Sequence, residues 1–248
     1  MVLFPLRLGR LSALALAACL AGVACPGARA AVSATVQEIL DGKELYIDSK
    51  PARVKDKANA PQRVSTGNSR GQLAFESGAA GRLNRFSQLK LGADCFLLGK
   101  GQILVSGKQN GCIKSSRMSV RGTNYVIDVS ESGEAELSVL EGSVEVTPSR
   151  NGQPTGAAST VVEAGQKVRL SPLGVVLALL KLSPADYTSV LTGPLFQGFK
   201  SPLPGFSSLE SYIRSNVPGV SIPGVSSIPS EPRFGMPRYI GPGGEVVW

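Results

Sequence analysis

The sequence is poor in residues that carry out acid–base or nucleophilic chemistry. None of its 248 residues is a histidine, which excludes Ser-His-Asp and Cys-His catalysis and removes the commonest metal ligand. One nucleophile spacing does occur, Ser87-x-x-Lys90. In a helix this spacing brings both groups to one face, but here it falls in a run typical of a strand, where residues three apart point to opposite faces. We therefore expect no Ser-Lys catalysis.

The remaining polar motifs also indicate a surface rather than an active site. A carboxylate pair for glycoside hydrolysis would have to come from Glu131, Glu134, Glu136, Glu141 or Glu145. Several of these alternate with apolar residues, as on the solvated face of a strand. Asp41-Gly42-Lys43 lacks the further oxygen ligands of a calcium loop, and Gly99-Lys100-Gly101 joins two strands instead of opening a helix. We predict no enzyme activity, no metal and no other cofactor.

Two of the four cysteines, Cys95 and Cys112, lie in the body of the chain with 16 residues between them. In an exported chain such a pair predicts one disulfide, which stabilises the fold by about 3 kcal/mol in the loop-entropy model. The alternative is two separately buried thiols. A zinc site is not expected, because no histidine accompanies them.

The start of the chain is typical of a secretory signal. Arg7 and Arg10 precede an apolar run over residues 11–24, and Ala28-Arg29-Ala30 fits a cleavage site. Cys19 offers a lipoprotein box as the alternative, although apolar residues continue past it. We expect residues 1–30 to be removed and the mature protein to be periplasmic or secreted.

The mature chain is predicted to be soluble and mildly basic. The net charge of +8 includes three leader arginines, and without them 23 basic residues face 18 acidic ones, a net charge of +5. The basic residues are scattered, so no specific nucleic-acid binding is expected, although attachment to an acidic polymer such as lipopolysaccharide stays open. The most apolar later run, residues 173–180, ends at Lys181 and is too short to span a membrane.

The clearest structural pattern is a hairpin over residues 118–146. Tyr125, Ile127 and Val129 alternate with more polar residues, residues 130–134 form a polar turn, and the alternation resumes from residue 135. The phase then shifts at Glu141-Gly142. Because a slip of one residue exchanges the two faces of a strand, Gly142 predicts a tight turn or a bulge.

Three motifs in this order resemble the FecR family of periplasmic domains. They are Val120-Arg121-Gly122-Thr123-Asn124-Tyr125, the Leu140-Glu141-Gly142-Ser143-Val144-Glu145-Val146 strand, and an opening segment at residues 64–73. The resemblance covers residues 62–147, and more loosely 35–172. It supplies no catalytic role. Gly122 and Thr123 fit a close approach of backbone and a cross-strand pair, or else Arg121, Gly122, Thr123, Tyr125 and Gly142 mark an edge that binds a partner.

Residues 31–172 are predicted to form a mainly β domain. Residues 98–105 and 139–146 share one pattern. In each, a glycine stands near the middle of the segment, between apolar residues, and the segment ends in an aliphatic residue, any residue and Val. Two such similar strand segments favour a β-roll or short β-solenoid-like sandwich. Residues 160–162 and 167–170 are expected to form a last hairpin.

Residues 173–248 are predicted to form a Pro/Gly/Ser-rich, largely irregular arm. Within it, residues 175–182 fit a short helix or a strand, Ser183-Pro184 fits a helix start, and residues 207–215 fit a second helix. The arm is either a passive linker or adheres to a surface through aromatic residues such as Trp248.

These observations favour a secreted interaction or sensory module that binds an envelope protein. FecR-type domains relay a signal from an outer-membrane receptor through one membrane helix to a sigma factor. This chain departs from that arrangement, because no internal membrane helix is predicted. The second hypothesis is a structural protein that binds a cell-wall or outer-membrane polymer.

Overall fold

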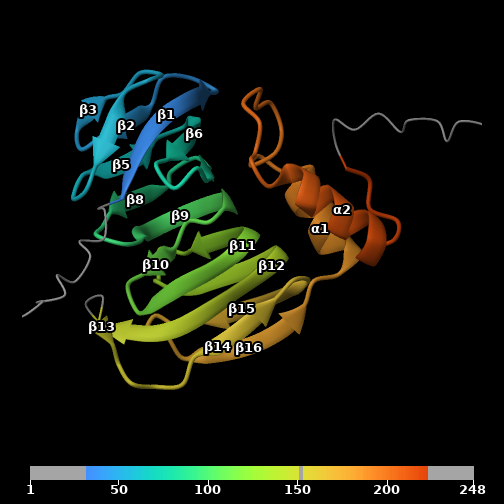
Figure 1. Ribbon diagram of the computed structural model, residues 1–248. Coiled ribbons are helices and arrows are strands. Elements are labelled where there is room, and N and C mark those ends of the chain that lie inside the picture. The colour runs from blue at the N-terminus through green and yellow to red at the C-terminus, as the bar shows by residue number, and fades with distance from the viewer. Residues whose placement is uncertain (1–31, 151–152, 223–248) are drawn as a thin grey trace, which may run out of the picture.

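The computed structural model describes residues 32–150 and 153–222, which form a rolled β-sheet with two helices beside it (Figure 1). The predicted leader with Cys19, and the arm beyond residue 222, lie outside the described residues. The elements are β1 (Ser33–Leu40), β2 (Leu45–Ile47), β3 (Lys50–Pro51), β4 (Lys57–Asn59), β5 (Arg63–Thr66), β6 (Arg70–Phe75), β7 (Ala80–Leu83), β8 (Gln88–Leu91), β9 (Phe96–Gly107), β10 (Gly111–Ile113), β11 (Ser116–Val129), β12 (Ala135–Arg150), β13 (Gln153–Pro154), β14 (Thr160–Glu163), β15 (Gln166–Leu170), β16 (Val176–Lys181), α1 (Pro184–Leu191) and α2 (Phe206–Asn216).

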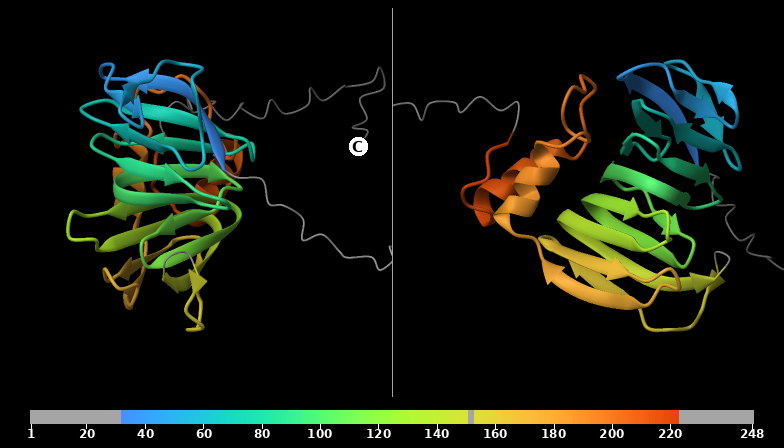
Figure 2. Two further views of the ribbon diagram at one scale, coloured as in Figure 1. Left: turned by 90° about the vertical axis from the view of Figure 1, so that its left-hand side faces the viewer. Right: turned by 180° about the vertical axis from the view of Figure 1, so that it is seen from behind.

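The strands stack along one axis, from β1–β3 at one end to β14–β16 at the other, and the views of Figure 2 show the same stack from two further sides. The main path of the sheet runs β16-β15-β12-β11-β10-β9-β7-β6-β1-β4. Among the described strands the pairing is antiparallel except between β9 and β10, which is parallel. The mainly β fold predicted from the sequence is confirmed.

Long strands that serve two neighbours produce the roll. The first part of β9 pairs with β8 and its second part with β7. In the same way, β12 pairs with β15 through its first part and with β14 through its second. Each strand carries a glycine at the change, Gly101 in β9 and Gly142 in β12, both with φ of 82°. This left-handed conformation costs glycine little, so the shared sequence pattern encodes a shared bend.

The predicted hairpin is confirmed as β11 and β12. The register changes between Arg121 and Asn124, where two residues of β11 oppose the single Gly142 of β12. This is a β-bulge, one of the two features that the phase shift at Gly142 predicted. The expected last hairpin is wrong. β14 and β15 each pair with β12 instead of with each other, because the turn at Gly165 donates its N–H to Val139 and keeps the chain running along β12.

The main core fills the inside of the roll and contains residues from both ends of the sheet, among them Leu73, Ile103 and Leu137, all fully buried. The predicted disulfide between Cys95 and Cys112 is present, with an S–S distance of 2.09 Å. It joins the start of β9 to β10, next to the only parallel pairing in the described sheet.

A second apolar cluster lies between the outer face of the sheet and the helices. Leu104 from β9, Val126 from β11 and Leu140 from β12 pack there against α1 and α2, which contribute Leu191 and Ile213. Both helices lie on one side of the strand stack (Figures 1 and 2). The predicted helix start at Ser183 is confirmed by a capping box with Asp186, and the second predicted helix is α2.

Candidate interaction surfaces

The residues that carry the resemblance to the FecR family lie around the bulge between β11 and β12. Arg121 and Gly122 are exposed, whereas Thr123 is 1% exposed and Tyr125 is fully buried. The Tyr125 hydroxyl donates to the main-chain oxygen of Gln109 at 2.6 Å. A side chain at Gly142 would meet Thr123 Cγ2 at 2.6 Å, so this part of the motif serves packing. A binding role of the Arg121 edge stays a prediction.

The hydroxyl of Ser87, the candidate nucleophile, is engaged in hydrogen bonds within the fold. Its side chain is 1% exposed, and its hydroxyl accepts the N–H of Gln102 at 2.9 Å and donates to the oxygen of the same residue at 3.1 Å. Lys90 lies on β8 and is exposed. In residues 32–150 and 153–222, acidic and cysteine side chains form no group of three that could hold a metal ion.

One pair of carboxylates adjoins β16. Asp128 and Glu136 oppose each other in the β11–β12 register, and both line a pocket of about 160 Å³ with Arg169 and Leu177. Burial raises the pKa of the Asp128 carboxyl, and the charge of Glu136 raises it further, while the amide of Gln102 works against both. The pair therefore places two carboxyl groups, one of them with a raised pKa, in the same pocket as Leu177.

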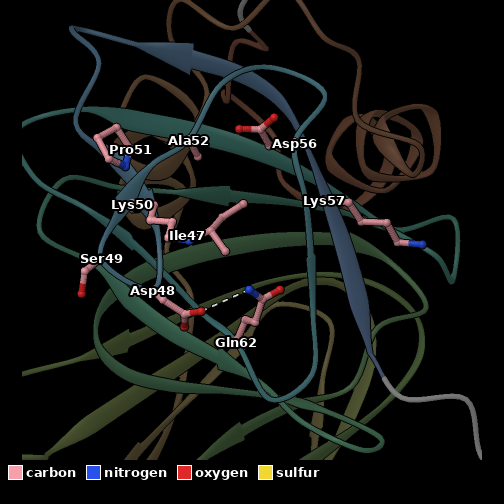
Figure 3. A pocket seen from close by; sticks show the side chains of 9 residues that line it. All are labelled: Ile47, Asp48, Ser49, Lys50, Pro51, Ala52, Asp56, Lys57 and Gln62. Atoms are coloured by element: carbon pink, nitrogen blue, oxygen red, sulfur yellow. Dashed lines mark hydrogen bonds between the residues drawn. The ribbon is translucent and has the colours of Figure 1, made fainter.

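A larger pocket opens at the other end of the roll, near β2, β3 and β4 (Figure 3). Its volume is about 500 Å³, and it is lined by Ile47, Asp48, Ser49, Lys50, Pro51, Ala52, Asp56, Lys57 and Gln62. Gln62 donates to Asp48 at 3.1 Å, and Lys57 pairs with Glu76 at 2.6 Å. Hydrogen bonds from the Arg63 N–H and from Gln62 lower the pKa of Asp48. The side chains of Asp48, Lys57 and Gln62 are thus used within the fold.

Four polar side chains on β1 and the β6–β7 pair hold residues 194–202, which connect the two helices. We call Glu38, Arg70, Gln72 and Arg82 the polar cluster, and residues 194–202 the docked segment. Arg82 is 5% exposed and donates to Gln72 Oε1 at 2.8 Å, to the Leu195 oxygen at 3.1 Å and to the Ser201 oxygen at 2.9 Å. Its guanidinium lies 4.4 Å from the centre of the Phe199 ring.

Arg70 holds the beginning of the docked segment. It binds Asp41 through two nitrogens, at 2.5 and 3.0 Å, and donates a third group to the oxygens of Pro194 and Gln197. Arg85, which is more exposed, also contacts Asp41, at 2.8 Å. The hydrogen bonds that the arginines send to the segment therefore end on main-chain oxygens.

Glu38 and Gln72 hold the end of the docked segment. The Glu38 carboxylate accepts the N–H of Lys200 at 3.0 Å and of Ser201 at 2.8 Å, and Gln72 donates to the Pro202 oxygen at 3.1 Å. Burial by itself would raise the pKa of Glu38, but the main-chain bonds and the charge of Arg82 outweigh it and lower this pKa. Burial lowers the pKa of Arg82 to about 10, so both groups are charged at neutral pH.

The strand β16 is the one apolar element of the described sheet that stays open to solvent. It ends the sheet and pairs only with β15. Val176, Leu177, Leu179 and Leu180 are 40–53% exposed, and Val175 just before the strand is 59% exposed. Edge strands of this kind are normally blunted by charge, proline or a cover, and an uncovered one offers a template for a further strand.

β16 is held firmly at both ends, so its exposure is a property of the folded structure. At its start, Ser171 and Val175 close a turn in which Gly174 approaches Ser115; a side chain at Gly174 would lie 2.6 Å from the Ser115 oxygen. At its end, Leu182 donates to the Gly165 oxygen at 2.7 Å, just before the capped start of α1. The sequence run that is too short for a membrane span therefore forms an exposed edge.

Comparison with known proteins gives only a slight likeness. No model of a protein family matches the chain, and no curated protein matches it in sequence. Two crystal structures of a "putative anti-sigma factor" from Parabacteroides distasonis are similar in part. One is 15% identical, with a TM-score of 0.42 over 53% of this chain and 65% of that chain; the other is 13% identical, with a TM-score of 0.39 over 62% and 88%. This chain thus spans less than two thirds of the first, and neither likeness carries a functional argument.

No helix among the described residues has both the length and the apolar character that a membrane crossing requires.

Proposed function

We propose that the protein is a non-enzymatic interaction module of the bacterial cell envelope, and that β16 is its binding surface. The observation that carries this proposal is the run of five apolar side chains, 40–59% exposed, on an edge strand that is fixed at both ends. An extended segment of a partner would add to this edge through main-chain hydrogen bonds, with side chains on both faces giving specificity.

Burial of the apolar side chains of β16 supplies part of the free energy that binding a partner requires. Full burial of a Val or Leu side chain contributes about 1.5–3 kcal/mol, so burying the exposed half of five contributes about 4–7 kcal/mol. Association opposes this with an entropy cost of about 4–15 kcal/mol. The apolar part of β16 alone therefore does not hold a partner. The partner must bring a matching apolar strand and main-chain pairing.

The rest of the molecule agrees with a binding role. The sequence has no histidine, and the polar cluster and Ser87 are engaged in holding the fold. The disulfide between Cys95 and Cys112 suits an oxidising compartment, as the predicted secretory leader requires. Because the motif around Gly122 and Gly142 resembles that of FecR-type domains, we propose envelope signalling as the process in which the module takes part.

The test is site-specific photo-crosslinking in the producing cells. A photoreactive residue replaces Leu177, which is 53% exposed in β16, or Val54, which is 50% exposed and lies outside β16. We expect a discrete protein adduct from position 177 and none from position 54. Equal labelling from both positions, or none from either, would contradict the proposal. Recovery of wall or outer-membrane polymer instead of protein would favour the polymer-binding hypothesis.

A further inference from the structure

The chemistry of β16 defines the partner that it requires. The strand carries apolar side chains on both faces: Leu179 shares the face of the buried core residue Val168, whereas Leu180 lies beside Lys167 on the outer face. A matching strand must therefore also be apolar on both faces, unpaired along one edge and held extended. β16 itself meets all three requirements.

We propose that this partner is a second copy of the chain, and that two β16 strands pair antiparallel across a two-fold axis at Leu179. This inference rests on the proposed function, because it names the occupant of the same surface. In this register Leu179 opposes its own counterpart, and Ala178 opposes Leu180 of the partner copy. The pairing joins the two rolled sheets into one continuous sheet, an isologous contact of the kind that closes a dimer.

Charge permits this register. The strand Val176–Lys181 contains one charged residue, Lys181, at its end. With the axis at Leu179, the two Lys181 residues lie four positions apart along the strands, about 13 Å, which exceeds the screening length of about 8 Å at physiological salt. Each Lys181 then stands opposite an apolar residue at the rim, where its amine reaches water. No like charges face each other across the new edge.

The apolar area that this pairing would bury predicts a reversible dimer. The exposed halves of the five apolar side chains amount to roughly 150–300 Å² in each copy, or roughly 300–600 Å² in the pair. Stable interfaces bury about 1,200–2,000 Å² in total, so main-chain and rim contacts must supply the remainder. We therefore expect a dissociation constant of about 1–100 µM rather than an obligate dimer.

Cysteine crosslinking tests both the partner and the register. In a chain whose Cys19 and Cys25 are replaced by Ser, Leu179→Cys places two thiols on the axis, within reach of a short bifunctional reagent. The matched control is Val175→Cys, at least as exposed but about 27 Å from its counterpart in this register. Because Cys95 and Cys112 are bonded to each other, the introduced thiol is the reactive one. We expect crosslinked dimer from Leu179→Cys at least tenfold above that from Val175→Cys.

Sedimentation equilibrium supplies the second measurement. We expect the mass to rise toward that of two chains with concentration, and Leu180→Lys to raise the dissociation constant at least tenfold with an unchanged melting temperature. A monomer at about 200 µM, twice the weakest dissociation constant expected, with no crosslink from Leu179→Cys overturns the inference.

Two further outcomes separate this inference from the proposed function. If the mass stays that of a monomer while position 177 labels another protein in cells, the proposed function stands and the second copy is refuted. If the Leu179→Cys variant is a monomer whose introduced thiol is protected from alkylation, the edge is covered by the chain's own residues after 222, and the second copy is again refuted.

Discussion

Replacing Arg82 by Met should release the docked segment while the rolled sheet stays folded. Arg82 makes three hydrogen bonds, at 2.8, 3.1 and 2.9 Å, two of them to the docked segment. A bond from a charged donor contributes about 1.5–3 kcal/mol, so the three together contribute roughly 4–9 kcal/mol. Burial of the charge opposes this: the pKa of Arg82 falls from 12.5 to about 10, which corresponds to about 3 kcal/mol. The net loss is therefore about 1–6 kcal/mol, and we take about 3 kcal/mol as the expected value.

Trypsin cleavage after Lys200 is the local readout. The Lys200 side chain is exposed, but the main-chain N–H groups of Lys200 and Ser201 are bound to Glu38, which protects the bond between them. When closing is faster than cleavage, the cleavage rate follows the open population. A change of about 3 kcal/mol then accelerates cleavage after Lys200 roughly a hundredfold. Mass spectrometry of early time points identifies the site.

The matched control is Arg85→Met. It removes one arginine from the same neighbourhood, but Arg85 is half exposed and makes a surface ion pair with Asp41 at 2.8 Å. Such pairs contribute little, so cleavage after Lys200 should change less than about threefold. The reasoning is refuted if Arg82→Met leaves this cleavage within that range of the parent, or if the two variants behave alike. Parallel acceleration at strand sites would show global unfolding instead of local release.

Three further predictions concern stability. Cys95→Ser removes the bridge to Cys112, whose 17-residue separation predicts a loss of about 3 kcal/mol under oxidising conditions; equal urea midpoints for variant and parent would count against it. Gly142→Ala should cost more than the roughly 1–2 kcal/mol expected of Gly122→Ala, because both have positive φ but only the first meets neighbouring atoms, at 2.6 Å; reversed melting temperatures would contradict this. Glu38→Gln should lower the melting temperature at pH 7, and by less as the pH falls below about 4.5. The native pKa of Glu38 lies below its ordinary value of 4.5, so its stabilisation is fully present above about pH 4.5, and the difference between the variant and the parent should shrink as the pH falls through the native value; a pH-independent difference would argue against it.

Local features of the fold were predictable from the sequence because the residues that determine them are close in the chain. The hairpin, the bulge at Gly142 and the capped start of α1 at Ser183 all follow from patterns within about 30 residues. The disulfide also followed, from the pairing of two cysteines in a chain for which a secretory leader is predicted. In contrast, the prediction of a last hairpin was wrong. A turn at Gly165 predicts that the chain reverses, but it does not predict the strand with which β14 and β15 each pair.

Neither the polar cluster nor the exposed edge at β16 was predicted from the sequence, and the physical reasons differ. In the sequence, Arg82 and Glu38 cannot be told apart from the scattered charges of a protein surface. Their partners lie 113 to 163 residues away, and no local pattern marks them. A signal for the helix layer did exist. Leu104, Val126 and Leu140 each stand beside inward-facing apolar residues, which is typical of strands buried on both faces. The same reasoning applied to β16 would have predicted burial, and the structure leaves it exposed.

The docked segment sets the order in which the molecule can be completed. Glu38 and Ser201 are 163 residues apart, so at about 5–20 residues per second of synthesis the carboxylate precedes its partner by roughly 8–30 s. During that interval Arg82 can bond to Gln72 but not to the oxygens of Leu195 and Ser201, and the outer apolar face of β9, β11 and β12 lacks its helices. Long-range closure of this kind is slow. The docking of residues 194–202 on the polar cluster therefore has to wait until this part of the chain has been made, whatever the sheet has formed before it.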